Sequence, residues 1–293
     1  MRLLITGGGG LMGSKVAEVA AMQGHEVFFG YHHEHHESSG QASHGKGIKF
    51  DLMDHASVVE AVRSSRPEVV IHTAALTDVD RCEIDKDTAY RVNVLGTKVL
   101  YEAAREMGAF TIYASTDYVF DGTRGMYSEE DKASPVNYYG YSKFLGEAYC
   151  DAVARTCVIF GARPASGKVN FALWLIDRLT KGEPAKVVTD QYVTPTLNTN
   201  LARMVLELAS RRLKGIYHLS GATRISRYDF ACELARVFDL KEELISPSSM
   251  AEMKWAARRP ADSSLDTSKA MKCLNEKPMA VGEALRTLKA EID

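Results

Sequence analysis

The chain has 293 residues, of which 45% are hydrophobic and 25% are charged, and its formal net charge is -2 at pH 7. This balance argues against a protein that coats nucleic acid or a membrane surface, because both functions require a large charge excess. No stretch has the roughly 20 apolar residues of a membrane span, no signal peptide is evident, and five scattered cysteines without a CxxC pair favour a reducing compartment, so we expect a cytoplasmic protein.

The first half of the chain alternates short apolar runs with longer stretches of helical spacing. Strands are predicted at residues 3–6, 26–29, 48–50, 68–72 and 110–115, and helices at residues 11–23, 57–64 and 86–107. Strands that alternate with helices pair in parallel through right-handed crossovers. The pattern therefore predicts an α/β fold with a doubly wound parallel sheet of the Rossmann type.

The regular alternation of predicted strands and helices ends after residue 160. Helices are predicted near residues 171–179, 198–210, 227–237 and 280–290, with short strands such as 216–219 between them. We predict a Rossmann domain at residues 1–160, with returning elements near 190–220. The remainder of residues 161–293 would form a smaller, discontinuous C-terminal α/β substrate domain.

A glycine loop, TGGGGLMG, lies between the first strand and the first helix. It places Gly7, Gly10 and Gly13 in a GxxGxxG frame. Glycines allow a tight turn and leave backbone N–H groups accessible, and the positive end of the helix dipole favours an anion. In this strand–loop–helix context the motif predicts a binding site for the pyrophosphate of a dinucleotide.

The segment YHHEHHESSG, residues 31–40, follows the second predicted strand. Its histidines and glutamates suggest a metal site, but the HExxH motif would need histidine where Glu37 stands, so we expect no metal. A solvated polar loop is a second interpretation. A third follows from its position, because the end of this strand in a Rossmann fold contacts the adenosine ribose. With no acid before Glu34, His32 or His33 could hold a 2′-phosphate, which favours NADP(H) over NAD(H).

The fifth predicted strand ends in STDYVFDG, residues 115–122, and NYYGYSKFLGE follows at residues 137–147. Tyr139 and Lys143 form a YxxxK pair, and their i, i+4 spacing places both on one face of a helix. Carbonyl reduction needs a proton donor, and a cation near a phenol stabilises its phenolate. Tyr139 would donate the proton, Lys143 would lower the pKa of the phenol, and Thr116 could donate a hydrogen bond to the carbonyl oxygen. Tyr138 and Tyr141 lack a lysine four residues later.

These motifs together resemble the extended short-chain dehydrogenase/reductase family. The resemblance is carried by TGGGGLMG, Asp51-Leu52, HTAA at residues 72–75, Asn93, STDYVFDG and YGYSK. Two later segments, DQYVTPT at residues 190–196 and RRPADSSLD at residues 258–266, resemble its dTDP-4-dehydrorhamnose reductase subgroup more narrowly. The match extends over nearly the whole chain.

The resemblance implies a role for individual residues. The cofactor contacts that it implies are Gly7, Gly10, Leu11, Met12 and Gly13 at the pyrophosphate, Asp51 and Leu52 at the adenine, Ala74 and Ala75 along the cofactor, Lys143 at the nicotinamide ribose, and Asn93. Thr116, Tyr139 and Lys143 would form the catalytic triad. Thr77 and Tyr118 would lie near the sugar, and Asn170, Gln191 and Arg259 are candidates for the nucleotide-sugar side, because an arginine fork suits a diphosphate.

The resemblance implies a reductase that transfers a hydride from NAD(P)H to the C4 carbonyl of a nucleotide-linked 4-keto-6-deoxy sugar, and it is compatible with a homodimer. One departure concerns Val158, because bacterial members of the subgroup carry tryptophan there, which leaves the sugar and the base open. A cofactor-binding regulatory subunit, similar to the β subunit of methionine adenosyltransferase, is an alternative, although the intact STD and YxxxK motifs favour an enzyme. A nucleotide-sugar 4-epimerase is a second alternative.

Overall fold

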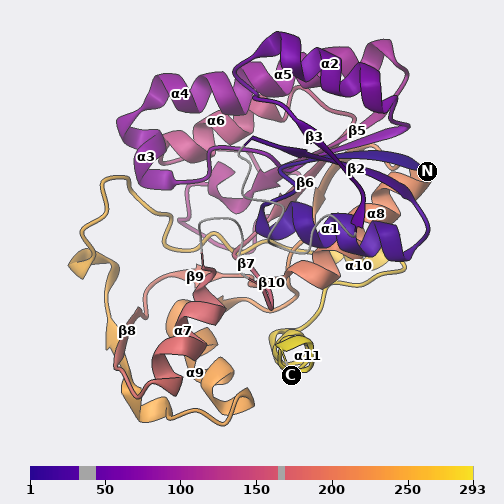
Figure 1. Ribbon diagram of the computed structural model, residues 1–293. Helices are drawn as coiled ribbons and strands as arrows, with labels where there is room; N and C mark the ends of the chain where they lie inside the picture. Colours follow the sequence, from indigo (N-terminus) through magenta and orange to yellow (C-terminus); the bar gives the residue numbers. More distant parts are fainter. Residues whose placement is uncertain (33–43, 164–168, 293) are drawn as a thin grey trace.

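The computed structural model describes residues 1–32, 44–163 and 169–292 (Figure 1). Within these ranges, seven parallel strands form the central sheet in the order β11-β6-β5-β4-β1-β2-β3. The strands are β1 (Arg2–Thr6), β2 (Glu26–Tyr31), β3 (Lys46–Lys49), β4 (Val69–His72), β5 (Phe110–Thr116), β6 (Ala152–Thr156) and β11 (Gly215–His218). The order reverses direction between β1 and β4, which confirms the predicted doubly wound parallel sheet.

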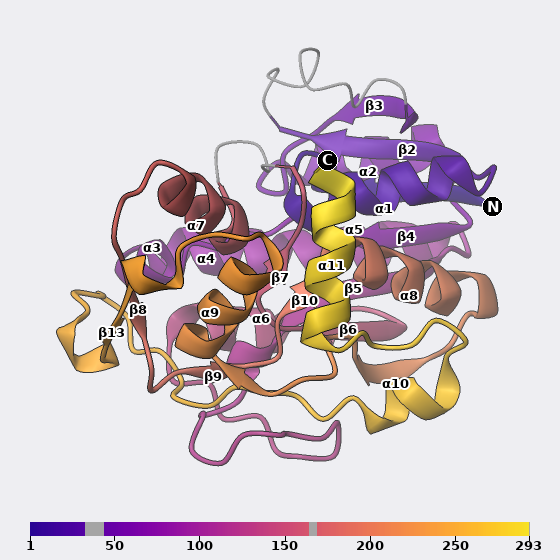
Figure 2. The ribbon, with the colours of Figure 1, turned by 90° about the horizontal axis from the view of Figure 1, so that it is seen from below.

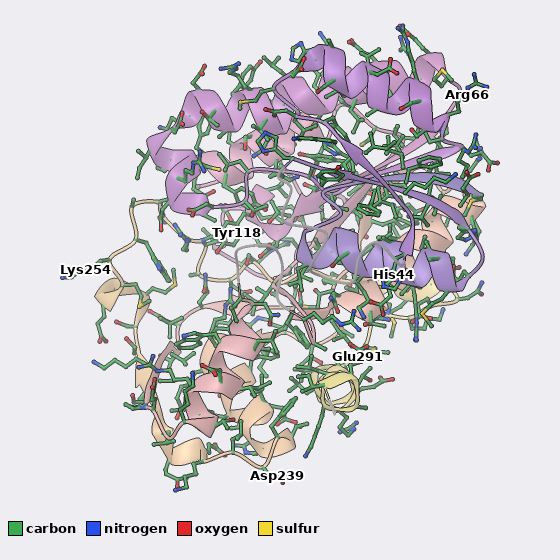
Figure 3. All side chains as sticks on the ribbon, in the orientation of Figure 1. His44, Arg66, Tyr118, Asp239, Lys254 and Glu291 are labelled. Carbon is green, nitrogen blue, oxygen red and sulfur yellow. The ribbon has the colours of Figure 1, made fainter. Side chains whose placement is uncertain are left out.

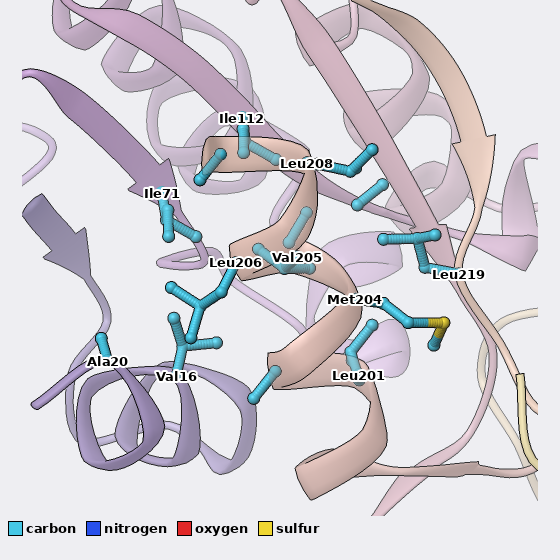
Figure 4. Close-up of a cluster of buried hydrophobic side chains, with 14 of the residues drawn as sticks. Val16, Ala20, Ile71, Ile112, Leu201, Met204, Val205, Leu206, Leu208 and Leu219 are labelled. Carbon is cyan, nitrogen blue, oxygen red and sulfur yellow. The ribbon is translucent and has the colours of Figure 1, made fainter. Parts of the chain in front are cut away.

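Helices cover both faces of this sheet (Figure 1). One face carries α1 (Leu11–Met22), α8 (Asn198–Arg211) and α10 (Ser268–Cys273). Figure 4 shows the core on this side, where Val16 of α1 and Val205 of α8 pack against Ile71 and Ile112 of the sheet. The other face carries α2 (His55–Ser65) and α5 (Thr97–Glu106), whose apolar side chains form a separate cluster. Apolar residues face the sheet from both layers because burying them removes that surface from water.

The predicted helix at residues 86–107 is present, but its middle is π-helical. The structure has α4 (Lys86–Tyr90), a π-helical stretch at Arg91–Gly96, and then α5. Inside the wide turn, the Asn93 amide accepts from the Leu76 backbone N–H at 2.8 Å and donates to its carbonyl at 3.0 Å. Such π-helical turns occur often at functional sites, and this one holds the loop after β4 in place.

A smaller part of the chain packs at the carboxyl ends of the sheet strands, below the sheet in Figure 1 and mostly to its left in Figure 2. Its helices are α7 (Phe171–Thr180), α9 (Arg227–Val237) and α11 (Val281–Ile292), and its strand pairs are β8 (Ala185–Val188) with β13 (Ile245–Ser248), β7 (Ile159–Phe160) with β10 (Thr196–Leu197), and β9 (Tyr192–Val193) with β12 (Ile225–Ser226). These elements bury a hydrophobic cluster of their own around Phe160, Leu175 and Phe230. Between them in sequence, α8 and β11 return to the large sheet.

Two further helices and three short 3-10 turns complete the described chain: α3 (Val79–Ile84), α6 (Tyr138–Gly146), and the turns at Asp117–Val119, Glu242–Leu244 and Met250–Glu252. Both helices lie beyond the carboxyl ends of β4 and β5 and pack against one another. Among the described residues, no helix is long and apolar enough to cross a membrane.

Candidate active site

The glycine loop joins β1 to the first turn of α1, and its shape depends on the glycines. Gly7 has φ +66°, and a Cβ there would lie 2.8 Å from the Ala74 backbone nitrogen. A Cβ on Gly13 would lie 2.3 Å from the Gly7 carbonyl oxygen. Gly10 is the N-cap of α1 and has no side chain with which to cover the helix end. The loop therefore presents bare backbone at a helix N-terminus, which suits a diphosphate group.

A cavity of about 860 Å³ runs from this loop to the carboxyl ends of β4 and β5. Its lining contains most of the residues that the sequence selected: Gly7, Gly10, Leu11, Met12, Gly13, Ala74, Ala75, Thr77, Thr116, Tyr139, Lys143 and Asn170. The glycine loop and the YxxxK pair are more than 120 residues apart in sequence, and the parallel sheet brings them to the same edge. This convergence makes the cavity the candidate active site.

Local structure fixes the three proposed catalytic side chains. Thr116 ends β5, and Tyr139 lies in the first turn of α6 with Lys143 one turn later. The Asn137 side chain caps α6 by accepting from the Gly140 backbone N–H at 2.8 Å. A Cβ on Gly140 would lie 2.0 Å from the Tyr118 carbonyl oxygen. A glycine at this position thus lets α6 approach the turn that follows Thr116.

The surroundings oppose charge on both members of the YxxxK pair. Burial raises the pKa of Tyr139 well above its usual value, and a side-chain hydrogen bond with Thr116 acts in the opposite direction. Burial also lowers the pKa of Lys143 to about 7, although Glu147 one turn later raises it. An ammonium group with a pKa of about 7 and a phenol one helical turn away are the groups that acid–base chemistry on a carbonyl oxygen needs.

Glu147 belongs to a buried network that the sequence did not reveal. Its carboxylate accepts from Arg155 of β6 at 2.7 and 2.9 Å, and from the Ser115 hydroxyl at 2.6 Å. Both charged side chains are under 10% exposed. Because the pair is buried and well hydrogen-bonded, it fixes the end of α6 to β5 and β6.

The predicted adenosine contacts lie outside the cavity lining. Nε2 of His32, at the end of β2, is 3.1 Å from Oδ2 of Asp51, and Leu52 is buried against α2 and α5. His32 and Asp51 therefore share one location beyond the carboxyl ends of β2 and β3. The prediction for His33, and the metal interpretation of the rest of the histidine run, fall on residues outside the described ranges. Among described residues, no cluster of three or more histidine, cysteine or acidic side chains could hold a metal ion.

Asn93 is 1% exposed, and it too lies outside the lining. Its amide N–H₂ donates to the Leu76 carbonyl and to the Ser142 hydroxyl, each at 3.0 Å. This geometry gives Asn93 a supporting position between α6 and the loop after β4. Contact between its amide and a cofactor is not favoured, because these partners already occupy it.

The predicted substrate residues differ in their positions. Thr77 and Asn170 line the cavity, and Asn170 also caps α7 by accepting from Leu173 N at 3.2 Å. Tyr118 lies beside Tyr139, with ring centroids 6.0 Å apart, between the large sheet and the smaller part (Figure 3). Gln191 is 3% exposed and its amide points to the Pro260 carbonyl at 3.4 Å, outside the cavity lining.

Arg259 is held by a carboxylate of α3 and is not among the residues that line the cavity. Its guanidinium donates two hydrogen bonds to Asp80, at 2.8 and 3.0 Å, and a third to the Ala257 carbonyl at 2.7 Å. It also lies over the Trp255 ring at 5.1 Å. The two guanidinium N–H groups of Arg259 that donate to Asp80 are the ones that a diphosphate would need.

Several lining residues were not predicted from the sequence, among them Asp78, Arg81, Asp117 and Val169. Asp78 could have been found as the N-cap of α3, because an Asp before a short helical run is a capping signal. Val158 has φ +43°, which is rare for a β-branched residue. Its neighbours hold this conformation, since Thr196 N–H donates to the Val158 carbonyl at 3.0 Å. No sequence signal predicts such strain.

Comparison with known families and curated proteins gives matches along the whole chain. A family described as "RmlD substrate binding domain" matches residues 1–293. A probable low-salt glycan biosynthesis reductase of Haloferax volcanii is 34% identical over 92% of this chain and 90% of its own length. A dTDP-4-dehydrorhamnose reductase of Aggregatibacter actinomycetemcomitans is 29% identical over 99% and 98% of the two chains. Methionine adenosyltransferase 2 subunit beta of Rattus norvegicus is 31% identical over 92% and 81%.

Solved structures share the fold over almost the full length. A hypothetical dTDP-4-dehydrorhamnose reductase from Sulfolobus tokodaii has a TM-score of 0.84 and 35% identity, covering 96% of this chain and 97% of its own. A dTDP-4-dehydrorhamnose reductase from Bacillus anthracis, solved in complex with NADP, has a TM-score of 0.83 and 28% identity, covering 99% of each chain.

Proposed function

The chain belongs to the family described as the RmlD substrate binding domain, and we propose that it is an NAD(P)H-dependent reductase of a nucleotide-linked 4-keto-6-deoxy sugar. The observation that carries this proposal is the convergence of Thr116, Tyr139 and Lys143 in one cavity with the glycine loop. Relatives named as dTDP-4-dehydrorhamnose reductases, matched over nearly their full length, support the same reaction class.

A nicotinamide cofactor, when bound, supplies the hydride that the carbonyl carbon accepts. Tyr139 then protonates the oxygen on which negative charge develops, and the Lys143 ammonium stabilises the phenolate that remains. The Thr116 hydroxyl donates a hydrogen bond to the same oxygen. Because Lys143 is 2% exposed, its charge acts on the phenolate through little water and is weakly screened.

The cofactor is assigned to the glycine loop, where Gly7 and Gly13 leave no room for a Cβ and keep the backbone accessible. NADP(H) is proposed over NAD(H) because β2 ends without an acidic residue before His32, although His32 itself faces the Asp51 carboxylate. The NADP complex of the Bacillus anthracis relative supports a nicotinamide cofactor.

The sugar is assigned to the side of the cavity lined by Thr77, Val158 and Asn170. Arg259 would reach a diphosphate by exchanging part of its pairing with Asp80. In this proposal the large sheet holds the cofactor and the smaller part, around α7 and α9, contributes the sugar side.

The direct test is oxidation of NADPH and NADH, measured with dTDP-4-dehydrorhamnose and a small panel of other 4-keto nucleotide sugars. Tyr139→Phe removes the phenol hydroxyl and should lower kcat on the order of 10²-fold or more, with cofactor binding retained. Turnover with none of the sugars would refute the proposal. Unchanged turnover in Tyr139→Phe would remove Tyr139 from the mechanism.

A second candidate is a cofactor-binding regulatory subunit, because subunit beta of methionine adenosyltransferase 2 is as similar in sequence as the reductases. The intact Thr116–Tyr139–Lys143 geometry weighs against it. Co-purification with a methionine adenosyltransferase, together with no reductase activity, would favour this candidate. For a 4-epimerase, the expected signature is tightly bound NAD that undergoes no net change.

A further inference from the structure

Asp117 is a buried carboxyl group at the floor of the cavity, immediately after Thr116. Its side chain is 3% exposed and lies where three distant segments meet. Oδ2 accepts from the hydroxyl of Ser263, in the C-terminal segment, and from the thiol of Cys157, after β6, at 3.1 Å. Oδ1 lies 3.0 Å from Oγ1 of Thr116. One oxygen is thus satisfied by two donors, and the other faces a catalytic hydroxyl.

The Thr116 hydroxyl has one proton and two lone pairs to distribute. The Tyr118 backbone N–H donates to Oγ1 at 3.2 Å and occupies one lone pair. Asp117 takes a second direction, and the third points to Tyr139 and the cavity. The 3.0 Å distance between Thr116 Oγ1 and Asp117 Oδ1 fits a hydrogen bond donated by either group. Which group donates depends on the protons of the neighbouring groups.

The protonation state of Asp117 decides what Thr116 can do. An ionised carboxylate only accepts, so the single proton of Thr116 would point at Asp117 and a lone pair would face the cavity. Thr116 could then not donate to a carbonyl oxygen. A neutral Asp117 donates from Oδ1 to Thr116, fills its second lone pair, and turns the Thr116 proton toward the cavity.

We propose that Asp117 is protonated in the active enzyme and acts as a positioning residue that directs the Thr116 hydroxyl toward the substrate oxygen. This inference rests on the proposed reductase function for its consequence, but the protonation itself is a property of the free protein. The role is distinct from that of Tyr139, because Asp117 acts only through Thr116.

Burial shifts Asp117 toward the neutral acid. Burial raises the pKa of Asp117, while the hydrogen bonds from Ser263, Cys157 and Thr116 lower it less. The ionisable groups around it are Tyr118 on the same turn, Tyr139 on α6, Cys157 after β6 and Arg227 at the start of α9. Arg227 is the cation in this group and favours ionisation, but within the described ranges no ion pair joins it to Asp117.

Infrared difference spectroscopy on the free protein at pH 7 tests the protonation. The spectrum of wild type minus Asp117→Asn should contain the C=O stretch of a neutral carboxylic acid. Asp121→Asn is the matched control, because the pKa of Asp121 is lowered by the Tyr127 hydroxyl and its loss should remove only carboxylate bands. A wild-type spectrum in which Asp117 contributes carboxylate bands alone would overturn the proposal, whatever the enzyme does with sugars.

Kinetics test the positioning. In Asp117→Asn the amide N–H₂ can donate to Thr116 while the amide oxygen accepts from Ser263 and Cys157, so kcat should stay within roughly tenfold of wild type. Asp117→Ala leaves Thr116 without this donor and should lose roughly 10²-fold in kcat, the usual cost of one lost donor at a developing oxyanion. Melting temperature and cofactor binding identify variants that fail to fold. A folded Asp117→Asn as inactive as Asp117→Ala would refute the positioning role, whereas an inactive wild type would refute the proposed function instead.

Discussion

The ammonium nitrogen of Lys143 lies 4.0 Å from the centroid of the Tyr113 ring. Both side chains are at most 2% exposed, and among the described residues no carboxylate forms an ion pair with Lys143. Glu147 is one turn away, but its oxygens already accept from Arg155 and Ser115. The electron-rich ring face therefore stabilises the lysine charge directly.

Replacing this ring should change the pH dependence of the reaction. In the proposed mechanism the protonated form of Lys143 is the active one, so activity should fall as pH rises through its pKa of about 7. Tyr113→Leu removes the ring face, worth roughly 1–2 kcal/mol for a desolvated cation, and should move this limb of the kcat profile about one pH unit lower. Tyr113→Phe keeps the ring face and is the control. Overlapping profiles for the Leu and Phe variants would exclude the interaction.

Val158 gives a prediction about stability. An L-residue with φ near +43° carries strain of roughly 1–2 kcal/mol, whereas glycine adopts this conformation freely. Val158→Ala and Val158→Gly both remove the apolar side chain, so their difference isolates the backbone. We expect the glycine variant to be the more stable by about 1 kcal/mol, although glycine is usually the less stable of the two. Urea unfolding of both variants measures this difference, and a more stable alanine variant would contradict the strain.

The cofactor preference can be tested at His32. An aspartate there would place a second carboxylate beside Asp51 and repel a 2′-phosphate. His32→Asp should lower the ratio of kcat/KM for NADPH over NADH by roughly tenfold or more, which corresponds to about 1.4 kcal/mol. His32→Asn changes the ring without adding charge and serves as the control. If the ratio is the same in all three proteins, His32 belongs to a polar loop with no part in cofactor selection.

The parts of the site that depend on local spacing could be predicted from the sequence. Tyr139 and Lys143 are one helical turn apart, and the glycine loop is defined by contacts within a short segment. The strand–helix alternation likewise predicted which strand ends would share one edge of the sheet. These features follow from periodicity and turn chemistry, which a single sequence carries.

What the sequence could not predict depends on contacts between distant segments. Asp117 meets Ser263 across 146 residues, and Arg259 meets Asp80 across 179. Neither pairing leaves a local pattern, because the partners are brought together only when the smaller part packs against the sheet. The π-helical turn at Asn93 was missed for a similar reason, since its partners, Leu76 and Ser142, lie in other elements.

The Arg259–Asp80 pair leads to a prediction about substrate affinity. Asp80 accepts two hydrogen bonds from Arg259 and one from the Ala257 backbone N–H at 2.8 Å, so it fixes the segment that carries the arginine. If the guanidinium fork also contacts the substrate diphosphate, Arg259→Lys should raise KM for the nucleotide sugar roughly tenfold, because lysine cannot bind two oxygens in the same geometry. The effect on kcat should be smaller, since Arg259 is not among the residues that line the cavity with Tyr139 and Lys143.

Arg258→Lys is the matched control, because Arg258 is the adjacent arginine and its side chain is exposed. Asp80→Asn tests whether Asp80 orients Arg259 or competes with the substrate diphosphate for it. Losing the charged partner should raise KM if Asp80 mainly orients Arg259, and should lower KM if Asp80 mainly competes with the diphosphate. Steady-state kinetics with the nucleotide sugar varied, at saturating cofactor, distinguishes these cases. Equal KM values for wild type, Arg258→Lys and Arg259→Lys would place the diphosphate elsewhere in the cavity.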